Sequence, residues 1–213
     1  MTTDKAQLIE HLSARIGDQR VLGAIATVPR DLFVPSALRR EAWENTSLPI
    51  AEGQTISQPT VVARMCELLE LTGAETVLDV GTGSGYHAAV LAQLAARVIS
   101  IERWPSLSLS ARGALDAAGI ENVTLVVGDG SRGHASAAPY EAINVAAASD
   151  GDVPRALVDQ LADGGRLVAP VDGGEQRLTL IRRRGDGLER EHHDPVRFVP
   201  LIRGDGARRG RAD

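Results

Sequence analysis

A short run, Val77–Tyr86, places an acidic side chain and three closely spaced glycines at the end of a predicted strand. Asp79 stands before Gly81, Gly83 and Gly85, and an apolar helical pattern follows the last glycine. A strand, a glycine turn and a helix in this order let the backbone approach a nucleotide-like ligand, because glycine has no Cβ that would collide with it. The run therefore predicts a ligand-binding loop.

A second acidic residue supports this interpretation. Glu102 closes the next predicted strand, 21 positions after Gly81, a spacing that suits a carboxylate bound to two ribose hydroxyls. A nicotinamide enzyme is one alternative, but its Gly-x-Gly-x-x-Gly fingerprint would need glycine at Tyr86. The other alternative is a surface carboxylate that merely caps a buried strand end.

Small polar side chains precede the helix predicted at 60–71. Thr55, Ser57 and Gln58 offer two hydroxyls and an amide, groups that can orient a reacting partner. Ser57 followed by Pro59 is also typical of a helix N-cap, and on local sequence alone the cap is favoured. Asp129 and Gly130 follow the third predicted strand. On local sequence alone, an ordinary Asp-Gly turn is the favoured interpretation of this pair.

Five segments in this order resemble the protein-L-isoaspartate (D-aspartate) O-methyltransferase family: Leu48–Pro59, Gly81–Tyr86, Ile101–Arg103, Gly128–Gly130 and Pro195–Leu201. The glycine segment is shared by many S-adenosylmethionine-dependent methyltransferases, whereas the Gln54–Pro59 segment just upstream of it is far more specific. The resemblance extends from about Arg30 to Leu201, almost the whole chain.

The resemblance implies S-adenosyl-L-methionine as cofactor and the free α-carboxylate of isoaspartyl residues in damaged proteins as methyl acceptor. It implies that Ser57 orients this carboxylate. The cofactor residues it implies are Asp79, Gly81, Thr82, Gly83, Ser84, Gly85, Glu102, Arg103, Asp129 and Gly130. The substrate-binding residues it implies are Thr55, Ile56, Gln58, Arg197, Phe198 and Val199. The methyl ester would re-form a succinimide, which can hydrolyse to the normal linkage.

The chemistry needs little besides positioning. A carboxylate is ionised at pH 7, so a methyl acceptor of this kind requires no general base. It must instead lie about 3–3.5 Å from the methyl group, opposite the leaving sulfur.

Two alternatives stay open. Asn144, Ala146 and His134 depart from the family pattern, and some relatives methylate one aspartate of a dedicated ribosomal peptide to form an aspartimide. A non-catalytic cofactor-binding adaptor is the alternative of another class.

Composition narrows the function classes. The net charge is −5 and aromatic residues make up 3% of the 213 residues, which argues against nucleic acid as a partner. With one cysteine, Cys66, no internal disulfide can form, and no apolar run reaches the ~20 residues that span a bilayer. No His, Cys, Asp or Glu pattern has zinc-site spacing. We expect a cytoplasmic monomer that binds isoaspartyl proteins, with neither a membrane nor a metal.

The periodicity predicts one α/β domain over 1–203, a doubly wound and mostly parallel sheet, with N-terminal helices in about 1–58. Strands are predicted near 76–80, 97–101, 123–127, 141–146 and 166–171, and helices near 85–95, 105–118 and 154–161. Two further strands, near 178–181 and 196–201, should form an antiparallel edge. The polar, glycine-rich residues 204–213 predict a disordered tail.

Overall fold

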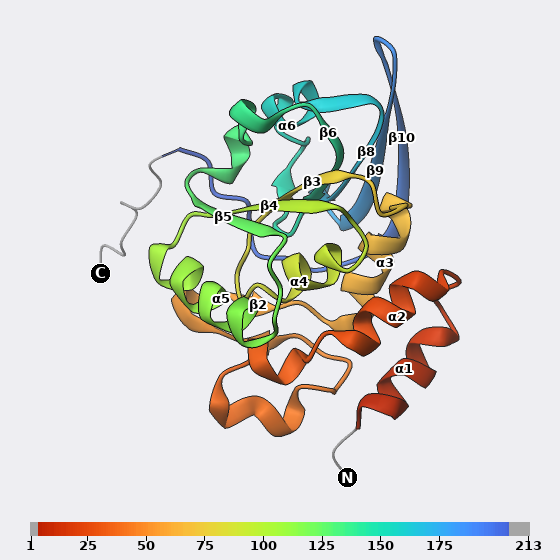
Figure 1. Cartoon of the computed structure of the whole chain (residues 1–213). Coiled ribbons are helices and arrows are strands. Elements are labelled where there is room, and N and C mark those ends of the chain that lie inside the picture. The colour runs from red at the N-terminus through yellow and green to blue at the C-terminus, as the bar shows by residue number, and fades with distance from the viewer. Residues whose placement is uncertain (1–3, 205–213) are drawn as a thin grey trace.

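The computed structural model describes residues 4–204, and its centre is an eight-stranded sheet (Figure 1). The main strand order is β10-β9-β8-β6-β3-β4-β5, and a short strand β7 pairs with β8. Strands β8, β6, β3, β4 and β5 are parallel to one another, whereas β9 pairs antiparallel with both β8 and β10. The predicted fold class is confirmed. The strands are β3 (Thr76–Val80), β4 (Arg97–Glu102), β5 (Val123–Val127), β6 (Tyr140–Val145), β7 (Ser149–Asp150), β8 (Leu161–Asp172), β9 (Gln176–Arg184) and β10 (Gly187–Pro195).

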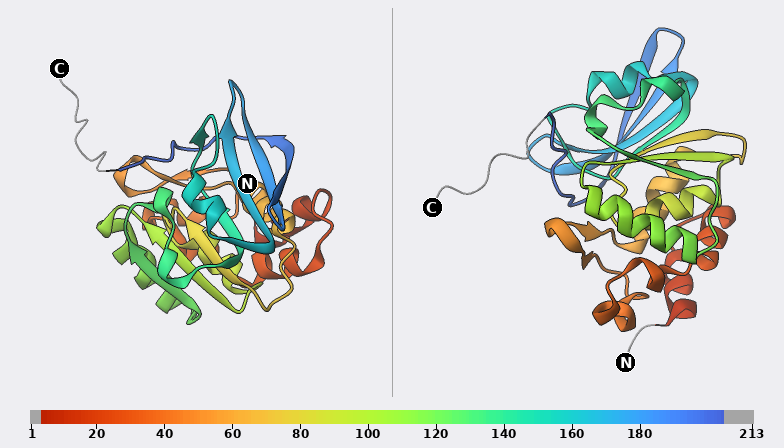
Figure 2. Two further views of the ribbon diagram at one scale, coloured as in Figure 1. Left: turned by 90° about the horizontal axis from the view of Figure 1, so that it is seen from above. Right: turned by 60° about the vertical axis from the view of Figure 1, so that its left-hand side comes forward.

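Helices cover both faces of the sheet, as Figures 1 and 2 show. One face carries α3 (Pro59–Leu69), α4 (Tyr86–Ala92) and α5 (Pro105–Ala117), and α1 (Lys5–Ser13) and α2 (Gln19–Thr27) pack outside them. The other face is covered by α6 (Arg155–Asp159) and by the short 3₁₀ helices Gly130–Arg132 and Ala135–Ala137.

The apolar strands follow from this two-sided cover. Along β3, Val77 belongs to the core under the larger helices, whereas Leu78 and Val80 belong to the core on the opposite face. A parallel strand buried on both faces is apolar at nearly every position, rather than at alternate ones. The polar exception is Asp79, which is fully buried and is therefore expected to have a specific role.

The sheet order reverses between β3 and β6, and the chain leaves both strands at the same edge. In doubly wound folds, ligands bind at this kind of switch point, outside the carboxyl ends of the strands. Gly81 and Ala146 follow the two strands directly, and a Cβ on Gly81 would lie 3.6 Å from the Ala146 Cβ. Because β10 runs in the same direction as β8, residues after Pro195 return to this edge.

The predicted strand at 196–201 is wrong. The partner of β9 is β10, which begins just after the turn at Gly185 and Asp186. Its residues are mostly exposed and polar, so they carry no apolar alternation that sequence periodicity could detect. Residues 196–201 instead cross the sheet at the carboxyl ends of the parallel strands, and they form a single bridge, between Pro200 and Ala148. The predicted tail lies outside the described residues, apart from Gly204.

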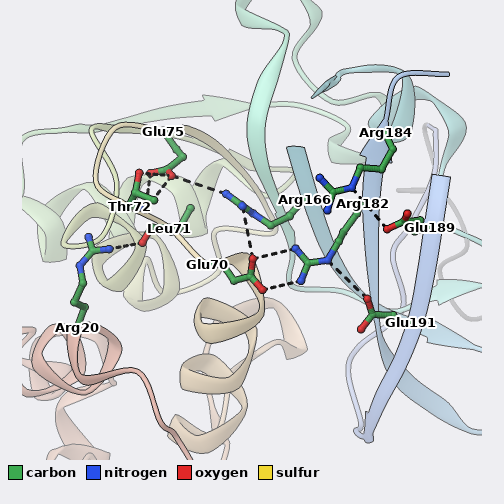
Figure 3. A network of polar contacts seen from close by, with 10 residues as sticks. All are labelled: Arg20, Glu70, Leu71, Thr72, Glu75, Arg166, Arg182, Arg184, Glu189 and Glu191. Atoms are coloured by element: carbon green, nitrogen blue, oxygen red, sulfur yellow. Dashed lines mark hydrogen bonds and ion pairs between the residues drawn. The ribbon is translucent and has the colours of Figure 1, made fainter. Parts of the chain in front are cut away.

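A polar network holds α3 to the antiparallel strands at the edge opposite the switch point (Figure 3). Glu70, in a left-handed conformation just after α3, accepts hydrogen bonds from both terminal nitrogens of Arg182 at 2.7 and 3.0 Å. Arg166 also lies near Glu70 and near Glu75, at 3.7 and 3.9 Å. The hydrogen bond from Arg182 is the largest of the causes that lower the pKa of Glu70.

Within the described residues, no helix is long and apolar enough to cross a membrane.

Candidate active site

Three cavities meet at the switch point. The largest is a groove of about 780 Å³ between the segment Thr55–Gln58, the β8–β9 turn and the segment Pro195–Val199. A second cavity, here called the Glu102 cavity, lies over the ends of β3 and β4, and a third, the glycine-loop cavity, lies between Ser57 and Gly81–Ser84. Thr55 and Ala146 line all three. A ligand in the groove and one in the Glu102 cavity would therefore meet beside these two residues.

Ser57 lines both the groove and the glycine-loop cavity, and it does not cap helix α3. The N-cap position is Gln58, whose side chain makes no cap bond. Asn45 supplies the cap instead, since its Oδ1 accepts hydrogen bonds from the backbone N–H of Thr60 at 3.1 Å and from the Thr60 hydroxyl at 2.9 Å. The Ser57 hydroxyl takes part in none of the hydrogen bonds found among residues 4–204. It is thus available to a ligand.

The glycine loop and the Glu102 carboxylate line one side of the Glu102 cavity. Gly81 adopts φ +96°, a conformation that side chains other than glycine rarely take. The Glu102 carboxylate, only 5% exposed, accepts hydrogen bonds from the backbone N–H of Gly83 at 2.8 Å and of Trp104 at 3.0 Å. A carboxylate has about four acceptor sites, so Glu102 keeps capacity for further donors such as hydroxyls.

Asp79 supports the glycine loop from behind and lines none of the three cavities. Its Oδ2 accepts a hydrogen bond from the Ser100 hydroxyl at 2.7 Å, and the Ser100 and Thr82 hydroxyls lie 2.6 Å apart. Its Oδ1 accepts from Asn144 Nδ2 at 2.7 Å. Burial raises the pKa of Asp79 to about 6, although both hydrogen bonds oppose this shift. Asp79 thus connects two strands to the loop.

His87 was not singled out as a site residue from the sequence, yet it lines the glycine-loop cavity. Its ring nitrogens lie 3.3 Å from Asn144 Nδ2 and 3.6 Å from Cys66 Sγ. Burial lowers the pKa of His87 to about 3, so the ring is neutral at pH 7. Cys66 is buried, and burial raises the pKa of its thiol.

The last described residues close over the Glu102 cavity. Val199–Ile202 line it, and the Arg103 guanidinium donates a hydrogen bond to the Ile202 carbonyl at 3.1 Å. Asp129 caps the 3₁₀ helix after β5, and its other carboxylate oxygen accepts from the Gly204 N–H at 2.8 Å. The Arg103 and Asp129 side chains thus hold residues 202–204 by hydrogen bonds beside the cavity.

The structure brings most of the predicted site residues to this junction. The groove is lined by Thr55, Ser57, Gln58, Arg197, Phe198 and Val199, the Glu102 cavity by Gly81, Gly83, Glu102, Arg103 and Gly130, and the glycine-loop cavity by Ile56, Thr82 and Ser84. Asp79, Gly85 and Asp129 line none of them and act on the site through their neighbours. A Cβ on Gly85 would lie 3.1 Å from the Ala111 Cβ, so this glycine permits close packing of α4 and α5.

Sequence reasoning missed the side of the groove formed by the β8–β9 turn, which contributes Asp172, Gly174, Glu175 and Gln176. The adjacent glycines at 173 and 174 mark a turn in the sequence, but no local pattern places that turn opposite Ser57. Trp104, which lines the Glu102 cavity, was also missed.

Comparisons with known proteins agree with this geometry. The sequence profile of the protein-L-isoaspartate(D-aspartate) O-methyltransferase family matches residues 3–206. The chain belongs to this family. A protein-L-isoaspartate O-methyltransferase of Halorhodospira halophila is 54% identical over 209 residues, which cover 96% of this chain and 94% of the relative. That of Aeromonas hydrophila is 52% identical over 200 residues, covering 93% and 97%.

Solved structures give the same family assignment. A protein-L-isoaspartate O-methyltransferase structure matches with a TM-score of 0.82 at 27% identity; the match covers 92% of this chain and 65% of that one. A structure from Plasmodium falciparum, described as a protein-L-isoaspartate O-methyltransferase in complex with S-adenosyl-L-homocysteine, matches with a TM-score of 0.80 at 25% identity. It covers 95% of this chain and 100% of that one.

The residues present fit the cofactor of this methyltransferase family, S-adenosyl-L-methionine. Glu102 retains acceptor capacity for a ribose, and the glycine loop exposes backbone rather than side chains to the cavity. Gly130 borders the same cavity, and a Cβ there would lie 2.6 Å from Val80 Cγ1, so this part of the wall requires glycine. The Glu102 cavity would hold the adenosyl part, with the glycine-loop cavity beside it.

Proposed function

We propose that this protein is a protein-L-isoaspartate O-methyltransferase in which Ser57 orients the acceptor carboxylate at the junction of the groove and the cofactor cavities. The observation that carries the role of Ser57 is its hydroxyl, which lines two of the cavities and is not used to cap α3. Family membership over nearly the whole chain supports the activity, methyl transfer from S-adenosyl-L-methionine.

Bound S-adenosyl-L-methionine supplies a methyl group on a cationic sulfonium. The acceptor carboxylate forms its O–C bond as the C–S bond breaks, and S-adenosyl-L-homocysteine leaves. Ser57 donates a hydrogen bond to one carboxylate oxygen and so directs the other toward the methyl group, while Thr55 borders the reacting atoms. Because the carboxylate is ionised at pH 7, these residues need only orient it and exclude water.

The groove suits an extended peptide on either side of the isoaspartyl residue. One wall is the extended segment Val196–Val199, whose Arg197 side chain is exposed. Residues 199 and 201 form backbone hydrogen bonds to Ala148, at 2.8 and 2.7 Å. The backbone N–H and C=O of Arg197 form no hydrogen bond with any described residue. A peptide backbone can bind there without its side chains being read, which suits a substrate defined by its linkage.

The test is methyl transfer from labelled S-adenosyl-L-methionine to two synthetic peptides that differ only in an isoaspartyl or aspartyl linkage. Base-labile methylation of the isoaspartyl peptide alone supports the proposal. Methylation of neither peptide, with cofactor binding intact, would contradict it and direct attention to a dedicated peptide substrate. Freshly prepared enzyme without peptide is the control, since Asp-Gly steps such as Asp186-Gly187 themselves form isoaspartate.

The monomeric state, the cytoplasmic location and the domain limits expected from the sequence stay predictions. Gel filtration with light scattering would test the first of them.

A further inference from the structure

Gln176 begins strand β9, and its side chain is bonded to the Val196–Val199 wall of the groove. Its Oε1 accepts a hydrogen bond from the backbone N–H of Phe198 at 2.7 Å, and its Nε2 donates one to the Phe198 carbonyl at 3.4 Å. Its backbone carbonyl accepts a third, from the N–H of Val196, at 2.9 Å. One residue therefore binds the segment 196–198 at three points.

Beyond the backbone bond to Val196, the two side-chain bonds continue a ladder that the backbone no longer extends. The pairing of β9 with β10 ends where Arg177 faces Pro195. The residues that precede Gln176 already belong to the turn from β8, so they do not pair with β10. The amide of a glutamine side chain has the same donor and acceptor as a peptide group. Gln176 thus presents this pair where the next backbone peptide would have been. The short contact to an N–H donor requires the oxygen at that position, which fixes the orientation of the amide.

The bonded segment forms part of two of the cavities. Val196–Val199 line the groove, and Val199 also lines the Glu102 cavity. Ala148 hydrogen-bonds the far end of the segment through Val199 and Leu201, whereas the hydrogen bonds that the described residues make to the end along the groove come from Gln176. Val196 and Phe198 pack against the main core, which leaves the exposed Arg197 on the other side of the segment.

We propose that Gln176 is a positioning residue for the peptide substrate, which sets the place of the Val196–Val199 wall and of the Arg197 peptide groups. This inference rests on the proposed function, because it assigns the groove to the peptide. It predicts that loss of the amide weakens peptide binding but leaves the methyl-transfer step and cofactor binding nearly unchanged.

The test compares three variants by steady-state kinetics with an isoaspartyl peptide and by direct measurement of S-adenosyl-L-methionine affinity. Gln176→Leu keeps the size but loses both side-chain bonds, so we expect the peptide KM to rise about tenfold and kcat to stay within about twofold. Gln176→Glu keeps the acceptor of the 2.7 Å bond but places a second acceptor oxygen near the Phe198 carbonyl, so its KM should also rise, though by less than in Gln176→Leu. Arg184→Ala, on an exposed residue at the other end of β9, is the control and should leave KM unchanged.

An unchanged KM in Gln176→Leu, or an equal rise in Arg184→Ala, would overturn the inference. So would a fall in kcat alone, since that would place Gln176 in the chemical step. Hydrogen exchange provides a readout that needs no activity: peptides covering 196–199 should exchange faster in Gln176→Leu than in wild type, while α3 stays unchanged. Unchanged exchange at 196–199 would refute the positioning role. A wild-type enzyme inactive on every isoaspartyl peptide would instead refute the proposed function alone.

Discussion

Replacing Ser57 and Asn45 in turn separates the two roles that the sequence left open for the start of α3. If Ser57 hydrogen-bonds the acceptor carboxylate, Ser57→Ala removes one bond to a charged group, worth about 1.5–3 kcal/mol. That loss lowers kcat/KM by roughly 10- to 150-fold. Because the hydroxyl bonds to none of residues 4–204, the free energy of unfolding should change by less than about 0.5 kcal/mol.

Asn45→Ala should show the opposite pattern. It removes the side chain that caps α3 through two bonds to Thr60, so stability should fall by about 1 kcal/mol. For a chain of this length that corresponds to a Tm lower by roughly 2–4 °C. Its kcat/KM should fall far less than that of Ser57→Ala.

The assays are initial rates of labelled methyl transfer to an isoaspartyl peptide, thermal unfolding, and calorimetric titration with S-adenosyl-L-methionine. Cofactor affinity should stay within about twofold of wild type in Ser57→Ala, because Ser57 is assigned to the acceptor. If Ser57→Ala keeps full kcat/KM, or if it unfolds at a lower temperature like Asn45→Ala, the assignment is refuted.

Three further predictions concern residues around the site and the opposite edge. Burial raises the pKa of Asp79 to about 6, so the contribution of Asp79 to stability is full below about pH 4 and is lost as pH rises through 6. Between pH 4 and 8, the free energy of unfolding of Asp79→Asn in urea should therefore rise by up to ~3 kcal/mol relative to wild type. A difference that does not depend on pH would contradict this. Gly130→Ala should destabilise by about 1–3 kcal/mol and weaken cofactor binding through the contact with Val80, whereas Gly113→Ala, with no atom within 4 Å, should not destabilise the protein. Glu70→Ala should lower the free energy of unfolding by about 0.5–1 kcal/mol at pH 7 in low salt. This loss should shrink with added salt and as acid protonates the carboxylate. A loss that does not depend on salt would contradict the ion-pair explanation.

Local patterns were sufficient for most of the parallel half of the molecule. Strands buried on both faces are continuous apolar runs, so β3 and β4 could be located from the sequence, as could the glycine loop between β3 and α4. Strand β10 could not, because it lies at the sheet edge, and exposed charged side chains carry no burial pattern. The mistaken strand at 196–201 has the apolar content of a strand, but it packs through Val196 and Phe198 while lying across the sheet edge.

The site shows the same division. Glu102 and the glycines follow from the spacing of two adjacent strands, since parallel neighbours end at one edge. Other parts of the site depend on contacts between distant segments, which no local pattern encodes. Examples are the Asn45 cap on α3, the Gln176 amide and the position of Trp104. Both Ser57 interpretations were available from the sequence; the contact of Asn45 with Thr60 argues against the cap, and the role toward the acceptor stays a prediction.

The most direct test of the account is a crystal structure of the protein with S-adenosyl-L-homocysteine and an isoaspartyl peptide. The account predicts the adenosyl group in the Glu102 cavity, the peptide in the groove, and the isoaspartyl carboxylate within hydrogen-bond distance of the Ser57 hydroxyl, beside Thr55 and Ala146. A carboxylate bound away from Ser57, or a peptide bound outside the groove, would contradict it.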